Sequence, residues 1–275
     1  MTNSEITNVM LGDTEAAALY MGDLLVWEQN IVFGENTLAG KFTDDSTKSD
    51  WMSAYGIVKF NARRFHKEIE VSSGDLYCFF SNCYKLEFVD HFPNTSRCTD
   101  LSGLFNVCDS LKRVDLSSLN TSNVVDMSFM FAECNALRAV DLSSFDTSKV
   151  TSMYQMFCNN ISLVEINLGN LDLSNVYTAD WMFMGCRSLT TVRGTIQGFG
   201  NAYNPDIYNH LGEYECPSLD LSDCPLTNSS AMVFINGLAK AKSDQTITFK
   251  AQTYDTLTSA QIAVATSKGW NVVRG

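Results

Sequence analysis

Apolar and polar positions recur in the middle of this chain with a period of 26 residues. The segments 111–136 and 137–162 carry the same residue at 12 of these 26 positions. A further copy follows at 163–188, and a copy shortened by one residue precedes them at 86–110. With partial copies at both ends, the array covers about 75–194. Self-similarity at such a period indicates a repeat architecture in which each unit stacks on the next.

Each unit predicts three elements in the same order. In the unit 111–136, Val114 and Leu116 alternate with Asp115, as in a short strand with its acidic residue on the opposite face. The polar stretch SSLNTS that follows predicts a turn, because these side chains bond their own backbone. Apolar residues then recur at steps of three or four: Val124, Met127, Met130, Phe131 and Cys134. That spacing predicts a helical return to the start of the next unit.

A single unit leaves both of its flat faces wet, so we expect each apolar side chain to pack on its counterpart in the next unit. The expected vertical neighbours include Val114 with Val140 and Phe131 with Phe157, about 4.8 Å apart along the axis. A strand, a turn and a helical return in so few residues predict an α/β solenoid, a right-handed leucine-rich-repeat coil with parallel strands.

Five segments follow from this pattern. They are a small β docking module at 1–35, a β-rich N-terminal cap at 36–74, the solenoid at 75–194, a loop insertion at 195–217, and an α/β C-terminal capping repeat at 218–275. Two Gly-Asp pairs, Gly12-Asp13 and Gly22-Asp23, predict turns between the apolar stretches of the first module.

The C-terminal cap contains stronger helix signals than the repeats. We expect a helix at roughly 228–241, a strand at 246–249, and a second helix that begins with Thr258 and Gln261 in capping-box spacing. Gly269 predicts its end.

Charge narrows the choice of partners. The chain has 275 residues, 19 of them basic and 31 acidic, with a formal net charge of −12. This charge repels phosphate backbones and anionic lipids, so we expect neither nucleic acid nor bare membrane as a partner, while cationic partners and neutral partners such as glycans remain. No apolar run approaches the roughly 20 residues of a membrane helix, so we expect no membrane insertion. The N-terminus lacks a basic region followed by an apolar stretch, and we expect no signal peptide.

The stretch 140–157, VDLSSFDTSKVTSMYQMF, resembles the BspA-like leucine-rich-repeat family of bacterial surface antigens. The similarity spans about 120 residues, and its D-T-S, M-x-x-M-F and C-x-x-L elements keep register. The N-terminal LGDTEAAALYMGDLLVWE is similar to short modules of phage tail and surface proteins of gut anaerobes. The resemblance implies a non-enzymatic protein, cell-surface or phage-borne, that binds host proteins, cells or glycans.

These features favour a recognition and attachment protein in a virion, such as a phage tail or fibre component. Its partners would be a host cell-surface protein or glycan and, through the segment 1–35, neighbouring particle subunits. The absence of a leader favours the virion over a cell envelope. A BspA-type adhesin at the bacterial surface and a purely structural decoration protein of a particle remain as alternatives.

Two columns of side chains are candidate binding sites. The first is the strand column Asp90, Asp115 and Asp141, which is either a hydrated row of carboxylates or a weak calcium or polar-ligand strip. The second changes its chemistry from unit to unit, as a shaped recognition surface requires. Its candidate residues are Tyr77, Phe129, Tyr154, Tyr177 and Trp181. The alternative is that these aromatic side chains merely cover the helical side of the coil.

No residue pattern indicates catalysis. The three histidines, His66, His91 and His210, stand in no nucleophile–base or HExxH context, and no P-loop or GxGxxG occurs. The recurring cysteines Cys83, Cys108, Cys134 and Cys186 are typical of small buried hydrophobic residues. We therefore predict no enzyme, no cofactor and no metal centre.

Overall fold

The computed structural model describes residues 76–90, 92, 95–203 and 216–275, together with the strands at 9–11, 14–16 and 59–60. Strands β1 (Val9–Leu11) and β2 (Thr14–Ala16) pair antiparallel on either side of the predicted Gly12-Asp13 turn. The Gly22-Asp23 turn, all three histidines and most of the predicted segments 1–35 and 36–74 lie outside the described residues.

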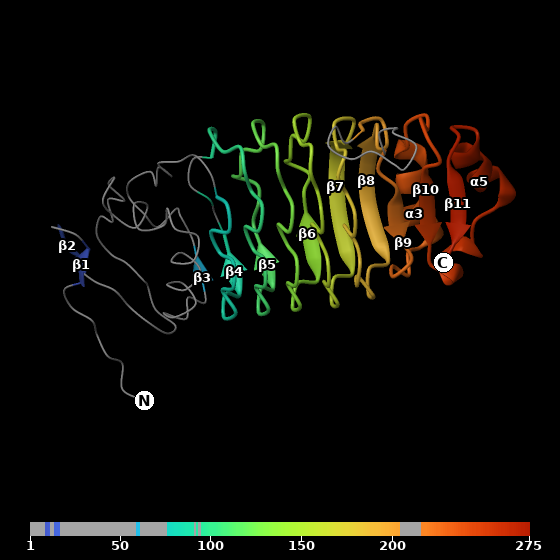
Figure 1. Ribbon diagram of the computed structural model, residues 1–275. Coiled ribbons are helices and arrows are strands. Elements are labelled where there is room, and N and C mark those ends of the chain that lie inside the picture. The colour runs from blue at the N-terminus through green and yellow to red at the C-terminus, as the bar shows by residue number, and fades with distance from the viewer. Residues whose placement is uncertain are drawn as a thin grey trace.

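The repeats stack in a row along one axis, one coil of the chain beside the next (Figure 1). Their strands are β4 (Phe88–Val89), β5 (Arg113–Val114), β6 (Ala139–Asp141), β7 (Glu165–Asp172) and β8 (Thr191–Gln197), and β3 (Lys59–Phe60), from the predicted cap 36–74, pairs with β4. Two parallel sheets result, with the orders β3-β4-β5 and β6-β7-β8. Val140 pairs with Ile166, so the register follows the 26-residue period.

Each coil has two sides, which we call the strand segment and the return segment. In the unit 137–162 the strand segment is 137–145 and the return segment is 150–160. The return segments also pair in parallel with their neighbours, through bridges from Asp100 to Asp126, from Asp126 to Ser152 and from Ser152 to Thr178.

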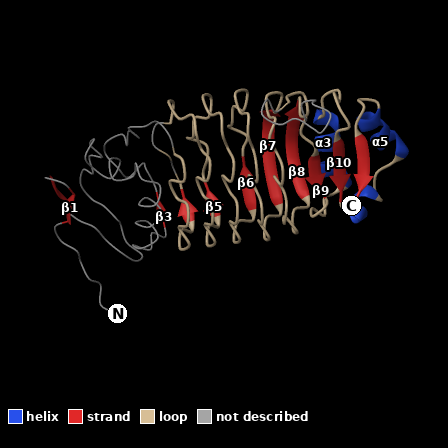
Figure 2. Cartoon of the chain, in the orientation of Figure 1, coloured by secondary structure: helices blue, strands red, loops and turns tan. Residues whose placement is uncertain are grey.

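The predicted helical return is wrong: the described return segments consist of turns (Figure 2). Alternate N–H groups donate to the next coil, for example from Phe129 to the carbonyl of Tyr154 at 2.9 Å and from Phe131 to that of Met156 at 2.9 Å. The N–H of Met130, between these two residues, donates instead within its own coil, to the carbonyl of Met127 at 3.3 Å.

Geometry explains why a helix does not form here. An α-helix with its side chains is about 10–12 Å wide, whereas parallel strands lie about 4.8 Å apart, so helices cannot stack at strand spacing in a straight row. A chain of turns fits this spacing and pairs its backbone across coils. Each return segment also carries two left-handed residues four positions apart, such as Phe129 (φ 58°) and Glu133 (φ 60°), and these interrupt any helix.

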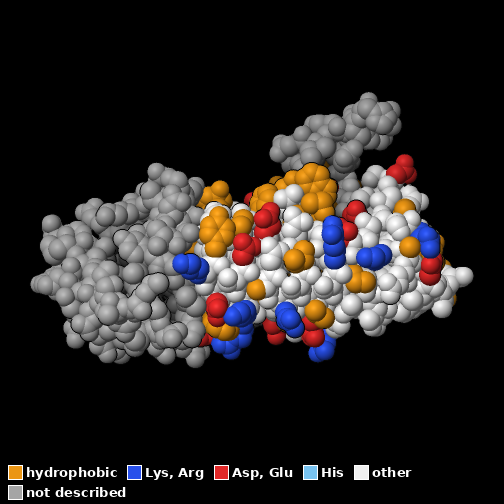
Figure 3. Space-filling view, turned by 90° about the horizontal axis from the view of Figure 1, so that it is seen from below, with side chains coloured by type: hydrophobic (Ala, Val, Ile, Leu, Met, Phe, Trp, Pro, Cys, Tyr) orange, Lys and Arg blue, Asp and Glu red, His pale blue; other side chains and the backbone are white. Residues whose placement is uncertain are grey.

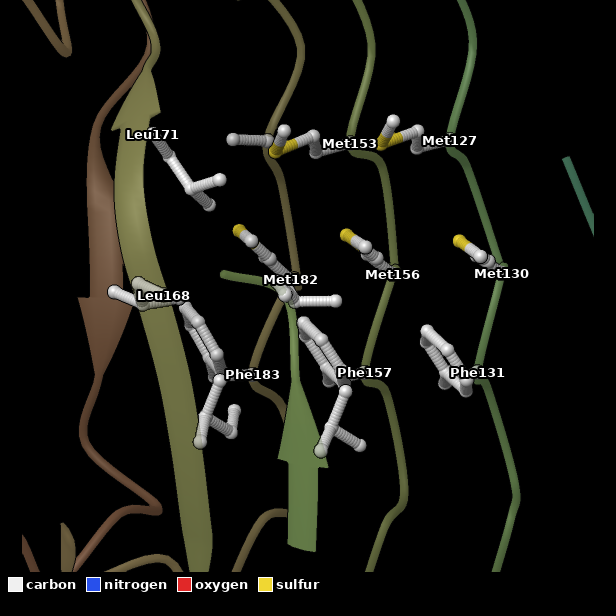
Figure 4. Close-up of a cluster of buried hydrophobic side chains, with 14 of the residues drawn as sticks. Met127, Met130, Phe131, Met153, Met156, Phe157, Leu168, Leu171, Met182 and Phe183 are labelled. Carbon is white, nitrogen blue, oxygen red and sulfur yellow. The ribbon is translucent and has the colours of Figure 1, made fainter. Parts of the chain in front are cut away.

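A stack of phenylalanine rings runs through the core of the repeats. Phe131 lies over Phe157 with ring centroids 5.5 Å apart and planes 3° apart, as the sequence period predicted. Figure 4 shows the methionines at 130, 156 and 182 in a parallel row beside these rings. The full stack comprises Phe80, Phe105, Phe131, Phe157 and Phe183, with successive centroids 5.3–5.7 Å apart.

Acidic and amide side chains fix turns at several positions of each coil, including the corner between the strand segment and the return segment. Asp146 accepts hydrogen bonds from the N–H and hydroxyl of Ser148, at 3.0 and 2.7 Å. Asp115 accepts in the same way from Ser117, at 3.0 and 2.6 Å. The same Asx turn, an acceptor two residues before its donor, recurs at Asp100, Asn120, Asp126, Asp141, Asp172 and Asp220. Much of the acidity of the repeats therefore serves turn formation.

The predicted buried cysteines are confirmed as one core position. Cys134 donates through its thiol to the carbonyl of Phe105 at 3.1 Å, and Cys186 to that of Phe157 at 3.0 Å. In the coil between them Asn160 takes the place of cysteine and donates to the carbonyl of Phe131 at 2.6 Å. Its Oδ1 atom is buried and accepts no hydrogen bond.

The helices of the described chain gather at its C-terminal end (Figure 2). Helix α3 (Asn228–Gly237) begins where expected but ends four residues earlier, and β10 (Thr246–Phe249) matches the predicted strand. Helix α5 (Ser259–Thr266) carries the predicted capping box of Thr258 and Gln261. The remaining elements are β9 (Leu219–Leu221), the short helix α4 (Ala251–Tyr254) and β11 (Asn271–Arg274), and the sheet order is β9-β10-β11.

The C-terminal elements close the open end of the repeats. The N–H of Gly185, which lies where earlier coils bond to their neighbour, donates instead to a carboxylate oxygen of Asp223 at 2.7 Å. On the strand side, the N–H of Val192 donates to the hydroxyl of Ser230 in α3 at 2.9 Å. Strand β8 itself extends to Gln197, so the first three residues of the predicted loop insertion belong to a strand. Edge strands protected in this way do not pair with other chains.

Candidate functional site

Three aromatic side chains from three successive coils meet on the return segments. The ring of Tyr154 lies 5.2 Å from that of Phe129, edge to face, and 5.6 Å from that of Trp181, in a tilted arrangement. Phe129 and Tyr154 are half-buried, whereas Trp181 is 50% exposed. We call these three residues the aromatic cluster.

The backbone under the aromatic cluster is held in an unfavourable conformation. Phe129 (φ 58°) and Trp181 (φ 56°) both lie in the left-handed region, where the equivalent residue of an earlier coil is Gly103 (φ 65°). That conformation costs a residue with a Cβ atom about 1–2 kcal/mol, and bulky residues rarely adopt it. Local structure therefore favours glycine at these positions, and the large rings must have another role.

The other two predicted aromatic residues do not join this cluster. Tyr77 is 38% exposed and lies two coils before Phe129, in the column of Tyr154. Tyr177 is half-buried, and its N–H donates to the carbonyl of Thr151 at 3.0 Å. The structure therefore brings together three of the five predicted aromatic residues.

The aspartate column lies on the strand segments, away from the return segments that carry the aromatic cluster. Asp90 forms an ion pair with Arg113 at 2.7 Å. Asp115 accepts from Ser117, and Asp141 accepts from the N–H of Ser143 and from the side chain of Asn167, at 2.8 and 3.1 Å.

Hydrogen bonds from Ser143, countered in part by desolvation and supported by Asn167, lower the pKa of Asp141. Among the described residues no group of three His, Cys, Asp or Glu side chains is placed to hold a metal ion. The calcium interpretation of the aspartate column thus gains no support.

A shallow groove of about 300 Å³ lies on the same three coils as the aromatic cluster, four to seven residues after the ring of each coil, at the end of the return segment. Its lining residues are Glu133, Asn135, Asn159, Ile161, Gly185 and Arg187. Gly185 (φ 76°) leaves space there, because a Cβ atom at this position would lie 2.5 Å from Oδ1 of Asn159. Sequence analysis missed this groove. The only indication of it in the sequence is a second position of each unit whose residue differs between units while the core residues stay the same.

The thiols of the core are unreactive. Burial raises the pKa of Cys83 to about 12 and that of Cys158 to about 11, and it also raises the pKa of Cys108. A buried thiol with a raised pKa supplies no thiolate nucleophile near neutral pH.

The two long edges of the described surface differ in chemistry. Figure 3 shows hydrophobic side chains gathered along one edge and charged side chains of both signs gathered along the opposite one.

Within the described part of the chain, no helix is long and apolar enough to cross a membrane.

The repeats match one known family. Residues 75–194 match the family described as "Mycoplasma protein of unknown function, DUF285". No curated protein and no solved structure matches the chain. The matched span coincides with the repeat array that the sequence period delimits, so the likeness covers the repeats and the aromatic cluster on them.

Proposed function

We propose that this protein is a non-catalytic recognition and attachment protein of a virion, and that its repeats contact a protein or glycan on the surface of a target cell. The repeats would be a solenoid of the leucine-rich-repeat type with turns in place of helices. The aromatic cluster is the contact site, and the segment 1–35 docks to neighbouring particle subunits.

The observation that carries this proposal is the aromatic cluster itself. Three large rings occupy successive coils, two of them on backbone that favours glycine. A solvent-facing tryptophan on rigid backbone supplies contact area at little cost in conformational entropy, and such residues dominate binding energies. The variation from coil to coil, above a constant core, supports recognition rather than stacking as their role.

Binding to cells tests the proposal. The fluorescently labelled full chain is titrated onto panels of gut bacteria and of epithelial cells, and bound label is measured by flow cytometry. We expect saturable binding to at least one cell type, weakened about tenfold or more in a Tyr154→Ala, Trp181→Ala double variant. The matched control is Tyr84→Ala, which removes a 46% exposed tyrosine outside the cluster.

Two results would contradict the proposal. One is a full chain that binds no cell type, and the other is equal loss of binding in the control and the double variant. Deletion of 1–35 separates the two roles, because it should abolish incorporation into particles and leave cell binding by the repeats intact.

A further inference from the structure

The aromatic cluster and the shallow groove lie on the same three coils, and we call the two together the strip. Each return segment contributes to both: Phe129 and Glu133 come from one coil, Tyr154 and Asn159 from the next, and Trp181 from the third. Ring centroids of neighbouring coils are 5.2 and 5.6 Å apart, so the strip presents one aromatic ring from each coil at a regular spacing along the stack. A regular strip of this kind fits a linear polymer that runs along the stack.

Ring geometry argues against a cationic ligand. Quaternary ammonium groups bind in a cage whose ring faces point at a central space. Here Tyr154 contacts both Phe129 and Trp181, so the rings pack on one another and leave no space for a cation between them. What they offer instead is the apolar surface of Trp181, which is 50% exposed and fits the apolar face of a sugar ring.

Charge argues against an anionic ligand. Asp180, next to Trp181, and Glu133 in the groove are both exposed, and the chain carries a net charge of −12. Such a field disfavours phosphate-, sulfate- or uronate-rich polymers.

The groove supplies the polar half of the site. Glu133, Asn159 and Arg187 are exposed and line it with carboxylate, amide and guanidinium groups. These planar groups pair with two neighbouring hydroxyls at once, as donors and acceptors.

We propose that the strip binds an uncharged linear glycan that lies along the stacking axis, with sugar rings against the aromatic cluster and hydroxyls in the groove. This inference rests on the proposed function and names its ligand class.

Selective removal of cell-surface glycans or proteins tests the ligand class. Cells that bind the full chain are treated either with periodate, which cleaves vicinal diols of sugars, or with proteinase K. We expect periodate to abolish binding and the protease to leave it. Binding should also change less than about twofold between low and physiological salt, because a neutral ligand is not screened.

Variants locate the glycan on the strip. Asn159→Ala and Arg187→Ala should each weaken cell binding about fivefold or more, while Trp181→Ala weakens it about tenfold or more. Arg138→Ala, an exposed arginine outside the groove, should leave binding unchanged. Circular dichroism melting confirms that each variant is folded.

The outcomes separate this inference from the function it rests on. Binding that survives periodate and is lost with the protease overturns the glycan and leaves attachment in place, as does competition by choline chloride or hyaluronate. Groove variants that bind like the full chain overturn the strip. Absence of binding to any cell overturns both proposals.

Discussion

The strand segments and the return segments of the repeats both stack on the next coil, but they present different side chains to solvent. Both bond their backbone to the next coil, and both bury one face in the same core. On the strand side, the outward side chains satisfy one another through ion pairs such as Lys112 with Glu87 at 3.0 Å and Arg193 with Glu165 at 3.2 Å. On the return side, large rings face solvent on strained backbone.

This difference indicates which surface is free to bind. Side chains that pair with their neighbours along the stack lose those partners when a ligand arrives, whereas an exposed ring on rigid backbone loses only water. Exposed ion pairs contribute little to stability, about 0–1 kcal/mol each, so the ion pairs of the strand surface have little effect on the free energy of unfolding.

The largest effect is expected in the core beneath the return segments. Phe157→Ala should lower the free energy of unfolding by about 3–5 kcal/mol, because it removes a fully buried ring that stacks on both neighbours. Val140→Ala removes two methyl groups from a buried side chain of the strand segment and should lower the free energy of unfolding by less. Urea denaturation measures both values. Equal losses would mean that the two sides contribute alike to the core.

The second prediction concerns the one coil that departs from the cysteine pattern. Asn160→Cys should raise the free energy of unfolding by about 1–3 kcal/mol, because it removes a buried acceptor that has no donor and keeps a donor for the carbonyl of Phe131. The reverse change Cys134→Asn serves as the control and should destabilise the chain. A destabilised Asn160→Cys variant would show that the asparagine has a favourable role there.

The third prediction tests the strain under the aromatic cluster. Glycine usually stabilises a structure less than alanine, but at Trp181 (φ 56°) the order should reverse, with Trp181→Gly about 1 kcal/mol more stable than Trp181→Ala. Both variants should lose cell binding. Thermal melting of the pair provides the measurement, and an alanine variant that is the more stable one would remove the case for strain.

The smallest effect concerns the corners. Hydrogen bonds from Ser148 lower the pKa of Asp146. For Asp172, burial raises the pKa, but the hydrogen bonds from Ser174 and Gln197 together outweigh it and lower the pKa. Because these carboxylates have a lower pKa folded than unfolded, their contribution is complete above the ordinary value of 3.8 and is lost as pH falls through the lowered pKa.

Denaturation in urea between pH 6 and 3 checks this expectation. Stability should stay level above about pH 5 and decline below about pH 4. Asp146→Asn, which keeps the acceptor oxygen without the titrating charge, should flatten the decline slightly. A profile that is level down to pH 3 would mean that the Asx turns do not favour the charged form.

Sequence pattern found the core almost completely. The stacked rings of Phe131 and Phe157, the buried Cys134 and the capping box at Thr258 all follow from residue type and spacing. Local rules sufficed there because burial and capping depend on neighbours within a few residues or exactly one period away. The prediction of a helical return was wrong for a related reason. Apolar residues at steps of three and four bury one face both in a helix and in a chain of turns, so this spacing does not distinguish the two.

The candidate site was only partly predictable. The varying column pointed to Phe129 and Trp181, but nothing in the sequence showed that Tyr154 would lie between them or that Asp90 would pair with Arg113. Such contacts join residues about one period apart, and their formation depends on the side-chain directions that the backbone of each coil imposes.

Residue type and spacing were enough to predict the period, the buried positions and the capped end, because these depend on hydrophobicity and local backbone preference. The tertiary structure alone decided where the N–H groups of the return segments bond, and with it the left-handed backbone, the aromatic cluster and the groove. The physical reason is that stacking at strand spacing offers each return segment a hydrogen-bonding partner in the next coil, which no single repeat contains.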